Sequence, residues 1–140
     1  MTSEELDSLA PSLRPAIEAF PVPLVAVYLY GSRATGENLE DSDYDFAVLA
    51  ERPLTIRETM TLRDAFRESL PGGPEVDCVD LRRVPPTLAT QVLRVGLVLD
   101  CSDEMERGMV ETRLLSLYAM LNEERSGILS DIAERGSVYA

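Results

Sequence analysis

The feature of the sequence that most constrains the fold is a continuous apolar segment, Leu24–Tyr30, whose residues favour β-structure. No polar residue alternates with the apolar ones, so the segment predicts a strand that is covered on both faces. A strand of this kind needs helices on both sides of its sheet. The segment ends at Gly31-Ser32, where the chain is expected to turn into a helix.

Strands and helices alternate along the rest of the chain. Further strands are expected at Tyr44–Leu49, Val76–Leu81 and Leu97–Leu99. The connection between the first two strands is too short for a crossover helix, so the sheet should be mixed rather than purely parallel. We therefore expect an α/β (α+β) fold in which helices pack on a small mixed sheet, in one domain spanning residues 1–140.

Helices are predicted before, between and after these strands. The first begins at Thr2–Glu5, and Pro11 and Pro15 should divide it into two short helices, since proline removes a backbone donor. The others run from the capping box Thr55–Glu58 to about Leu70, from Pro86 to a closing Gly96, and from a cap at Ser102 to about Ala133. The last helix is long, and its apolar positions are spaced for one buried stripe that could pack in the core or carry an interface: Met109, Leu114, Leu117, Leu121 and Ile128.

The composition excludes several kinds of chemistry. The chain has no His and no Lys, so all 13 cations are Arg, against 25 Asp and Glu. Ser-His-Asp catalysis, His-ligated zinc and lysine-based phosphate binding are therefore excluded. The net charge of −12 argues against nucleic acid as a direct partner. The acidic N-terminus lacks an apolar signal segment, and the longest apolar stretch is too short to cross a membrane, so we expect a cytoplasmic protein without a membrane partner.

A second motif follows the first turn and predicts a metal and phosphate site. After Gly31-Ser32 come ten residues and then Asp43-Tyr44-Asp45, at the start of the second strand. Residues two apart on a strand point to the same face, so Asp43 and Asp45 could share a divalent cation. Oxygen ligands favour a hard ion, with Mg²⁺ expected where phosphates supply further ligands. The amides of the Gly31-Ser32 turn and the Ser32 hydroxyl could then receive a phosphate.

The spacing of these residues resembles the nucleotidyltransferase superfamily with the DNA polymerase β-type palm, whose motif is Gly-Ser, ten residues, Asp-x-Asp. The short chain is similar to the minimal nucleotidyltransferase (MNT) antitoxins that are paired with HEPN-domain toxins. The segment Glu75–Arg82 resembles the strand that carries the third carboxylate in that family, and the C-terminal helix is also similar. The resemblance implies ATP as donor and two Mg²⁺ ions as cofactors. It implies AMP transfer to a tyrosine hydroxyl of the HEPN ribonuclease toxin, which neutralises the toxin.

The resemblance also implies roles for individual residues. Asp43 and Asp45 would be catalytic metal ligands, and Gly31 and Ser32 would bind the nucleotide phosphates. The third catalytic and metal-binding carboxylate is Asp77 or Asp80, and the family pattern favours Asp77. Arg33 is a nucleotide-binding candidate that could pair with a phosphate oxygen or remain solvated. Tyr30 and Tyr44 flank the site and are interpreted as strand packing residues rather than base-stacking platforms.

Two other functions remain open at this point. The chain could adenylylate a small molecule such as an aminoglycoside, although such enzymes usually carry a second domain. It could also be an antitoxin that acts by binding only, although Gly31, Ser32, Asp43 and Asp45 are all present.

Overall fold

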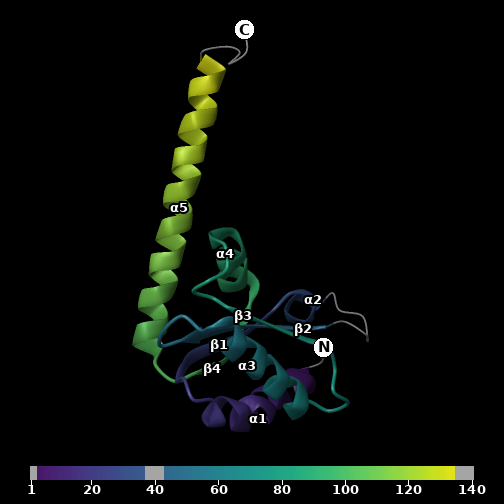
Figure 1. The fold of residues 1–140 in the computed structure, drawn as a ribbon. Coiled ribbons are helices and arrows are strands. Elements are labelled where there is room, and N and C mark those ends of the chain that lie inside the picture. Colours follow the sequence, from purple (N-terminus) through teal and green to yellow (C-terminus); the bar gives the residue numbers. More distant parts are fainter. Residues whose placement is uncertain (1–2, 37–42, 135–140) are drawn as a thin grey trace.

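Four strands form one mixed sheet in the computed structural model, which describes residues 3–36 and 43–134 (Figure 1). The strands are β1 (Leu24–Tyr30), β2 (Tyr44–Ala50), β3 (Val76–Asp80) and β4 (Leu97–Cys101), and their order in the sheet is β3-β2-β1-β4. Strand β1 pairs antiparallel with both β2 and β4, whereas β2 and β3 run parallel. The mixed sheet predicted from the sequence is therefore confirmed.

Helices cover both faces of this sheet, as the buried strand β1 requires (Figure 1). One face packs on α1 (Ser3–Ala19) and α3 (Ile56–Ser69), and the other packs on α4 (Pro86–Val95) and the beginning of α5 (Glu104–Glu134). The short helix α2 (Ser32–Thr35) follows β1 directly. The two faces hold separate apolar clusters, one built around Phe46 and Phe66 and the other around Tyr28 and Val92.

Helix α1 is one continuous helix, so the predicted break at Pro11 and Pro15 is wrong. The two prolines lie four residues apart and are both exposed, while Leu9 and Leu13 are buried on the opposite side. The backbone hydrogen bonds that the prolines remove therefore lie on the solvent side, where water can satisfy the free carbonyls. Burial of the apolar face against the sheet offsets the remaining cost.

Helix α5 is anchored to the sheet only near its beginning, and Figure 1 shows it projecting away from the rest of the fold. The hydroxyl of Tyr28 on β1 donates a 2.8 Å hydrogen bond to Glu111, which also accepts a 3.2 Å bond from Arg107. Val110 is buried, but Leu117, Leu121 and Ile128 are 41%, 44% and 62% exposed. The predicted buried stripe is therefore wrong for most of its positions within this chain, because Met109 is also 53% exposed and only Leu114 of the five packs against the apolar cluster. None of the described helices is long and apolar enough to span a lipid bilayer.

The sequence predicts the N-terminal cap of α3 correctly but not that of α5. Thr55 and Glu58 form the predicted capping box of α3. At α5, Asp103 caps the helix by accepting a 3.0 Å hydrogen bond from the amide of Glu106, so the prediction of Ser102 is wrong. The Ser102 hydroxyl instead donates to the carbonyl of Leu24 at 2.8 Å.

Candidate active site

The turn after β1 has the geometry that only glycine tolerates easily. Gly31 has a φ of 75°, in the left-handed region, and its carbonyl accepts hydrogen bonds of 3.1 and 3.3 Å from the amides of Ala34 and Thr35. Ser32 begins helix α2 and is half-buried. The chain thus turns sharply from the buried strand into a short helix, as the Gly-Ser pair predicts.

Gly31 lies directly against the carboxylate of Asp45. A Cβ atom built on Gly31 would overlap Oδ2 of Asp45 and would lie 3.2 Å from its Cγ. The two predicted parts of the site, the Gly-Ser turn and the Asp-x-Asp segment, therefore meet in the fold. The pairing of β1 with β2 produces this contact, because it places Tyr30, the last residue of β1, opposite Asp45.

Strand pairing also separates the two candidates for a third carboxylate, Asp77 and Asp80. Asp77 of β3 is the Cα partner of Asp45 of β2, and its side chain is exposed. Asp80 is 4% exposed and accepts hydrogen bonds from the amides of Leu54 at 2.8 Å and Arg82 at 2.9 Å. Asp80 is therefore engaged in holding the loop before α3, while Asp77 faces the other acidic residues.

The electrostatics of the cluster disfavour a full set of negative charges. Burial raises the pKa of Asp45 above its ordinary value, and the negative charges of Asp77 and Asp43 raise it further. Burial, together with the charges of Asp77 and Asp45, also raises the pKa of Tyr30 to about 12. A cation placed among these groups would relieve the repulsion, so the cluster has the charge expected of a cation site.

The described residues do not form a complete metal site by themselves. In residues 3–36 and 43–134, no group of three acidic or cysteine side chains is arranged to hold a metal ion. Mg²⁺ in phosphoryl-transfer sites is commonly held by one or two carboxylates, with substrate phosphates and water as the remaining ligands. One or two carboxylates from Asp43, Asp45 and Asp77, with phosphate and water as further ligands, are compatible with that arrangement.

Arg33 does not point toward the carboxylates. Its guanidinium carbon lies 4.0 Å from the centroid of the Tyr44 ring, which is a cation–π arrangement. Tyr44 packs with Phe46 on the α1 and α3 side of the sheet, whereas Asp45 is the next residue along β2 and points to the opposite face. The sequence interpretation of Tyr44 as a packing residue did not identify Arg33 as its contact. The alternation of side chains along β2 could have indicated that Tyr44 and Asp45 point to opposite faces.

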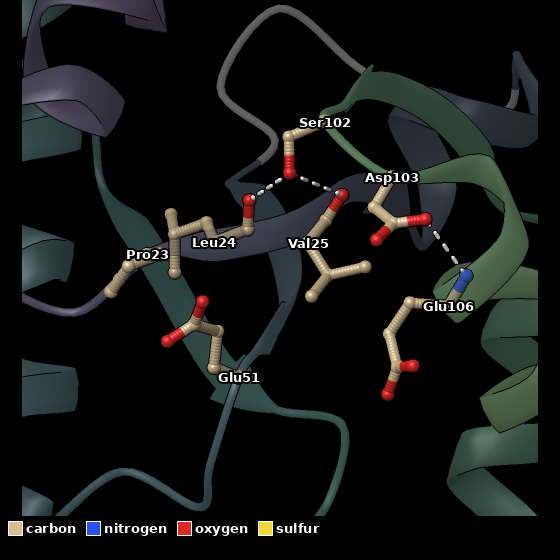
Figure 2. Close-up of a pocket in the computed structure, with 7 residues that line it drawn as sticks. All are labelled: Pro23, Leu24, Val25, Glu51, Ser102, Asp103 and Glu106. Carbon is tan, nitrogen blue, oxygen red and sulfur yellow. Dashed lines mark hydrogen bonds between the residues drawn. The ribbon is translucent and has the colours of Figure 1, made fainter.

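A second concave feature lies at the other end of β1, roughly 20 Å away by strand rise. This pocket of about 390 Å³ is lined by residues that include Leu24, Ser102 and three carboxylates: Glu51, Asp103 and Glu106 (Figure 2). Two of these lining side chains form structural hydrogen bonds: the Ser102 hydroxyl donates to the backbone of β1, and Asp103 caps α5. The pocket contains no residue of the Gly-Ser and Asp-x-Asp motif and is not the predicted site.

Comparison with known proteins identifies the class to which this fold and site belong. The family profile described as "Polymerase beta, Nucleotidyltransferase" matches residues 21–105, which is more than half of the chain and includes Gly31, Asp45 and Asp77. The chain therefore belongs to the polymerase beta nucleotidyltransferase family. The predicted nucleotidyltransferase fold is confirmed.

Several of the similar proteins are components of toxin–antitoxin systems. The chain is 31% identical over 109 residues to the protein adenylyltransferase MntA of Shewanella oneidensis, covering 78% of this chain and 76% of MntA. A chain in the crystal structure of a toxin–antitoxin with AMP-PNP is 27% identical, with a TM-score of 0.75 and coverage of 89% and 98%. A chain in the structure of the tri-AMPylated S. oneidensis HEPN toxin with its MNT antitoxin is 28% identical, with a TM-score of 0.66 and coverage of 95% and 99%. The predicted resemblance to MNT antitoxins is confirmed.

The contact between Gly31 and Asp45 makes a first prediction. Gly31→Ala should lower the free energy of unfolding by at least about 2 kcal/mol, since it adds a side chain at positive φ and also overlaps Asp45. Gly72→Ala is the matched control, because Gly72 has a φ of 79° with open space around it and should cost only about 1 kcal/mol. Urea unfolding measures both. Equal losses would contradict the close approach of Gly31 to Asp45.

Substitution of the two candidate third carboxylates should change the free energy of unfolding by different amounts. Asp80→Asn should lower the free energy of unfolding by about 2 kcal/mol, because its new amide group cannot accept both backbone hydrogen bonds in a buried position. Asp77→Asn should change stability by no more than about 0.5 kcal/mol, since Asp77 is exposed. Thermal and urea unfolding of both variants test this. A larger loss for Asp77→Asn would reverse the structural assignment.

The raised pKa of Asp45 predicts a pH-dependent effect on stability. A carboxyl whose folded pKa lies above its unfolded pKa destabilises the fold when it is ionised, and the penalty disappears as pH falls through the folded pKa. Asp45→Asn should therefore raise the melting temperature at neutral pH without added cation. This advantage should shrink as the pH approaches the ordinary aspartate value of about 3.9. An advantage that stays constant with pH would contradict the proposed repulsion.

Proposed function

We propose that this chain is an antitoxin that transfers AMP from ATP to a tyrosine hydroxyl of a partner HEPN toxin and thereby neutralises it. The observation that carries the proposal is the meeting of Gly31 with Asp45, which joins a turn suited to phosphate with a cluster of carboxylates suited to a cation. The protein adenylyltransferase MntA and the tri-AMPylated toxin among the similar proteins support the choice of AMP and of a protein acceptor.

The proposed nucleotide position follows from the turn. The chain turns away at Gly31, and the absence of a side chain there lets a phosphate approach the backbone closely. The Ser32 hydroxyl would donate a hydrogen bond to the phosphate next to it. The triphosphate would then lie across the face of the sheet that carries Asp45 and Asp77, rather than across the α1 and α3 face.

The carboxylates are proposed to hold Mg²⁺. Asp43, Asp45 and Asp77 supply only oxygen atoms, and burial, followed by the negative charges of Asp77 and Asp43, raises the pKa of Asp45. When bound, Mg²⁺ would supply charge stabilisation to the transferring phosphoryl group and to the leaving pyrophosphate. The protein's own contribution is positioning, because the ladder between β2 and β3 fixes Asp45 and Asp77 side by side.

The proposed reaction balances without any further reactant. The tyrosine oxygen of the toxin forms a bond to the α-phosphorus of ATP, and the bond between the α-phosphorus and the bridging oxygen breaks to release pyrophosphate. Asp77 would accept the hydroxyl proton, because its exposed side chain can meet a group that arrives from another protein. Since the donor is ATP, we expect the reaction in the cytoplasm.

The acidic surface supports a protein partner with a basic face. The net charge of −12 would attract a ribonuclease, whose RNA-binding surface needs positive charge. The same charge disfavours direct binding of nucleic acid by this chain.

The proposal predicts transfer that depends on the acidic pair. Purified protein with ATP, Mg²⁺ and the product of the adjacent reading frame should increase the mass of that product by one or more AMP units. Asp43→Asn and Asp45→Asn should each slow transfer by at least about a hundredfold, because they remove charge that supports the transition state. Asp64→Asn is the control, since Asp64 is an exposed residue of α3. Intact-protein mass spectrometry measures the transfer.

Other outcomes of this experiment would overturn the proposal in distinct ways. Toxin neutralisation that survives in both Asn variants without any gain in mass would show an antitoxin that acts by binding only. An aminoglycoside that accepts AMP while the protein partner does not would show a small-molecule enzyme. Full transfer in the Asn variants would remove the acidic cluster from the mechanism.

A further inference from the structure

We infer that Arg33 is a positioning residue, which clamps the ring of Tyr44 and so holds the Gly31-Ser32 turn against the strand that carries Asp45. The inference rests on the proposed function only for its effect on catalysis. The clamp itself is a property of the fold. It replaces the sequence-based alternatives for Arg33, a phosphate ligand or a solvated side chain, with a contact to a specific aromatic ring.

The ring beneath Arg33 is itself held by the core. The Tyr44 and Phe46 rings stack with centroids 5.9 Å apart and an interplanar angle of 10°, and Phe46 meets Phe66 of α3 edge-on at 5.3 Å. Phe46 and Phe66 are fully buried. The Arg33 guanidinium, 4.0 Å from the Tyr44 centroid, therefore contacts a ring that is linked to the buried core through Phe46 and Phe66.

The turn contacts both faces of β2. Gly31 lies against Asp45, and two residues later Arg33 covers Tyr44, which points to the opposite face of the same strand. Ala34 packs against the same apolar cluster as Tyr44, and Arg33 lines a hollow next to Leu6 of α1. Arg33 therefore lies on the α1 side, away from the face that presents the carboxylates.

This placement explains how a residue outside the acidic cluster can control it. The spacing between the turn and Asp45 sets where a phosphate and a cation could meet, and small errors in such spacing reduce rates strongly. Among the described residues, the β1–β2 ladder and the contact of Ala34 with the apolar cluster also hold the turn, and loss of the cation over Tyr44 would remove one of its attachments. If Arg33 were a phosphate ligand, its substitution would weaken ATP binding. If Arg33 clamps Tyr44, substitution of either residue should have the same effect on transfer.

Four variants and one double variant separate these roles. Arg33→Gln removes the charge and Tyr44→Leu removes the ring, while Arg33→Lys and Tyr44→Phe keep a cation and a ring. We expect Arg33→Gln and Tyr44→Leu each to lower kcat/KM for AMP transfer about five- to tenfold, with the same division between kcat and KM. The double variant should be no slower than the worse single variant. Tyr44→Phe should stay within about twofold of the parent, and Arg33→Lys should recover part of the loss.

A second measurement tests the contact between Arg33 and Tyr44 without an assay of AMP transfer. In the protein without nucleotide, amide hydrogen exchange over residues 43–50 should speed up in Arg33→Gln and in Tyr44→Leu, and should be unchanged in Tyr44→Phe. Arg33 is only half-buried, so the Arg33 variants should fold even if Tyr44→Leu does not. If the parent protein transfers no AMP, the proposed function fails, and hydrogen exchange still decides the clamp.

Three results would overturn the inference. A higher KM for ATP in Arg33→Gln together with an unchanged KM in Tyr44→Leu would make Arg33 a phosphate ligand. Unaltered hydrogen exchange in Arg33→Gln, or losses that multiply in the double variant, would show that Arg33 and Tyr44 act independently.

Discussion

Strand pairing holds together negative charges that would separate in solution. The charged pair is Asp45 and Asp77, which are partners across β2 and β3, and the neutral Tyr30 of β1 lies opposite Asp45, so the sheet ladder fixes their spacing. Burial raises the pKa of Asp45, and the negative charges of Asp77 and Asp43 raise it further, so the sheet ladder and the packing of the sheet between two helical layers must keep these carboxylates in place. The stability of the core is therefore what maintains an arrangement that is unfavourable until a positive charge joins it. This is the physical basis for connecting the cluster with a cation and a triphosphate.

Strand β2 carries two different functions on alternate residues. Phe46 and its neighbours on one face form the core with α1 and α3, while Asp45 on the other face belongs to the acidic cluster. A rigid core on one side thus positions charged groups on the other, without a loop between them. The same alternation separates Asp77, which is exposed beside Asp45, from the buried Asp80, which anchors the loop before α3. Residues three apart on a short strand therefore have unrelated roles.

Much of the fold could be predicted because the deciding interactions are local. The apolar run Leu24–Tyr30 indicates a buried strand, and Thr55 with Glu58 forms a capping box within one helical turn. The errors arise where tertiary contacts decide. Burial of one helix face outweighs the two prolines of α1, and the Ser102 hydroxyl bonds to β1 rather than to α5. The apolar spacing of α5 correctly indicates a helix, but spacing alone cannot tell that Met109, Leu117, Leu121 and Ile128 stay exposed within this chain.

The candidate site was predictable in its parts, and less so in the direction of its side chains. The spacing of Gly31 and Asp45 indicates a phosphate turn and a cation pair, and their contact in the fold follows from the antiparallel pairing of β1 with β2. Arg33 is next to Ser32 in sequence, which suggests a shared ligand, yet α2 turns its guanidinium to the opposite face of the sheet. On a tight turn, side chains two residues apart can point to opposite faces of the sheet. Paired residues on adjacent strands, by contrast, point to the same face. For this reason the contacts of the residues that follow the glycine come from the three-dimensional structure, whereas strand period and pairing indicate which carboxylates lie side by side.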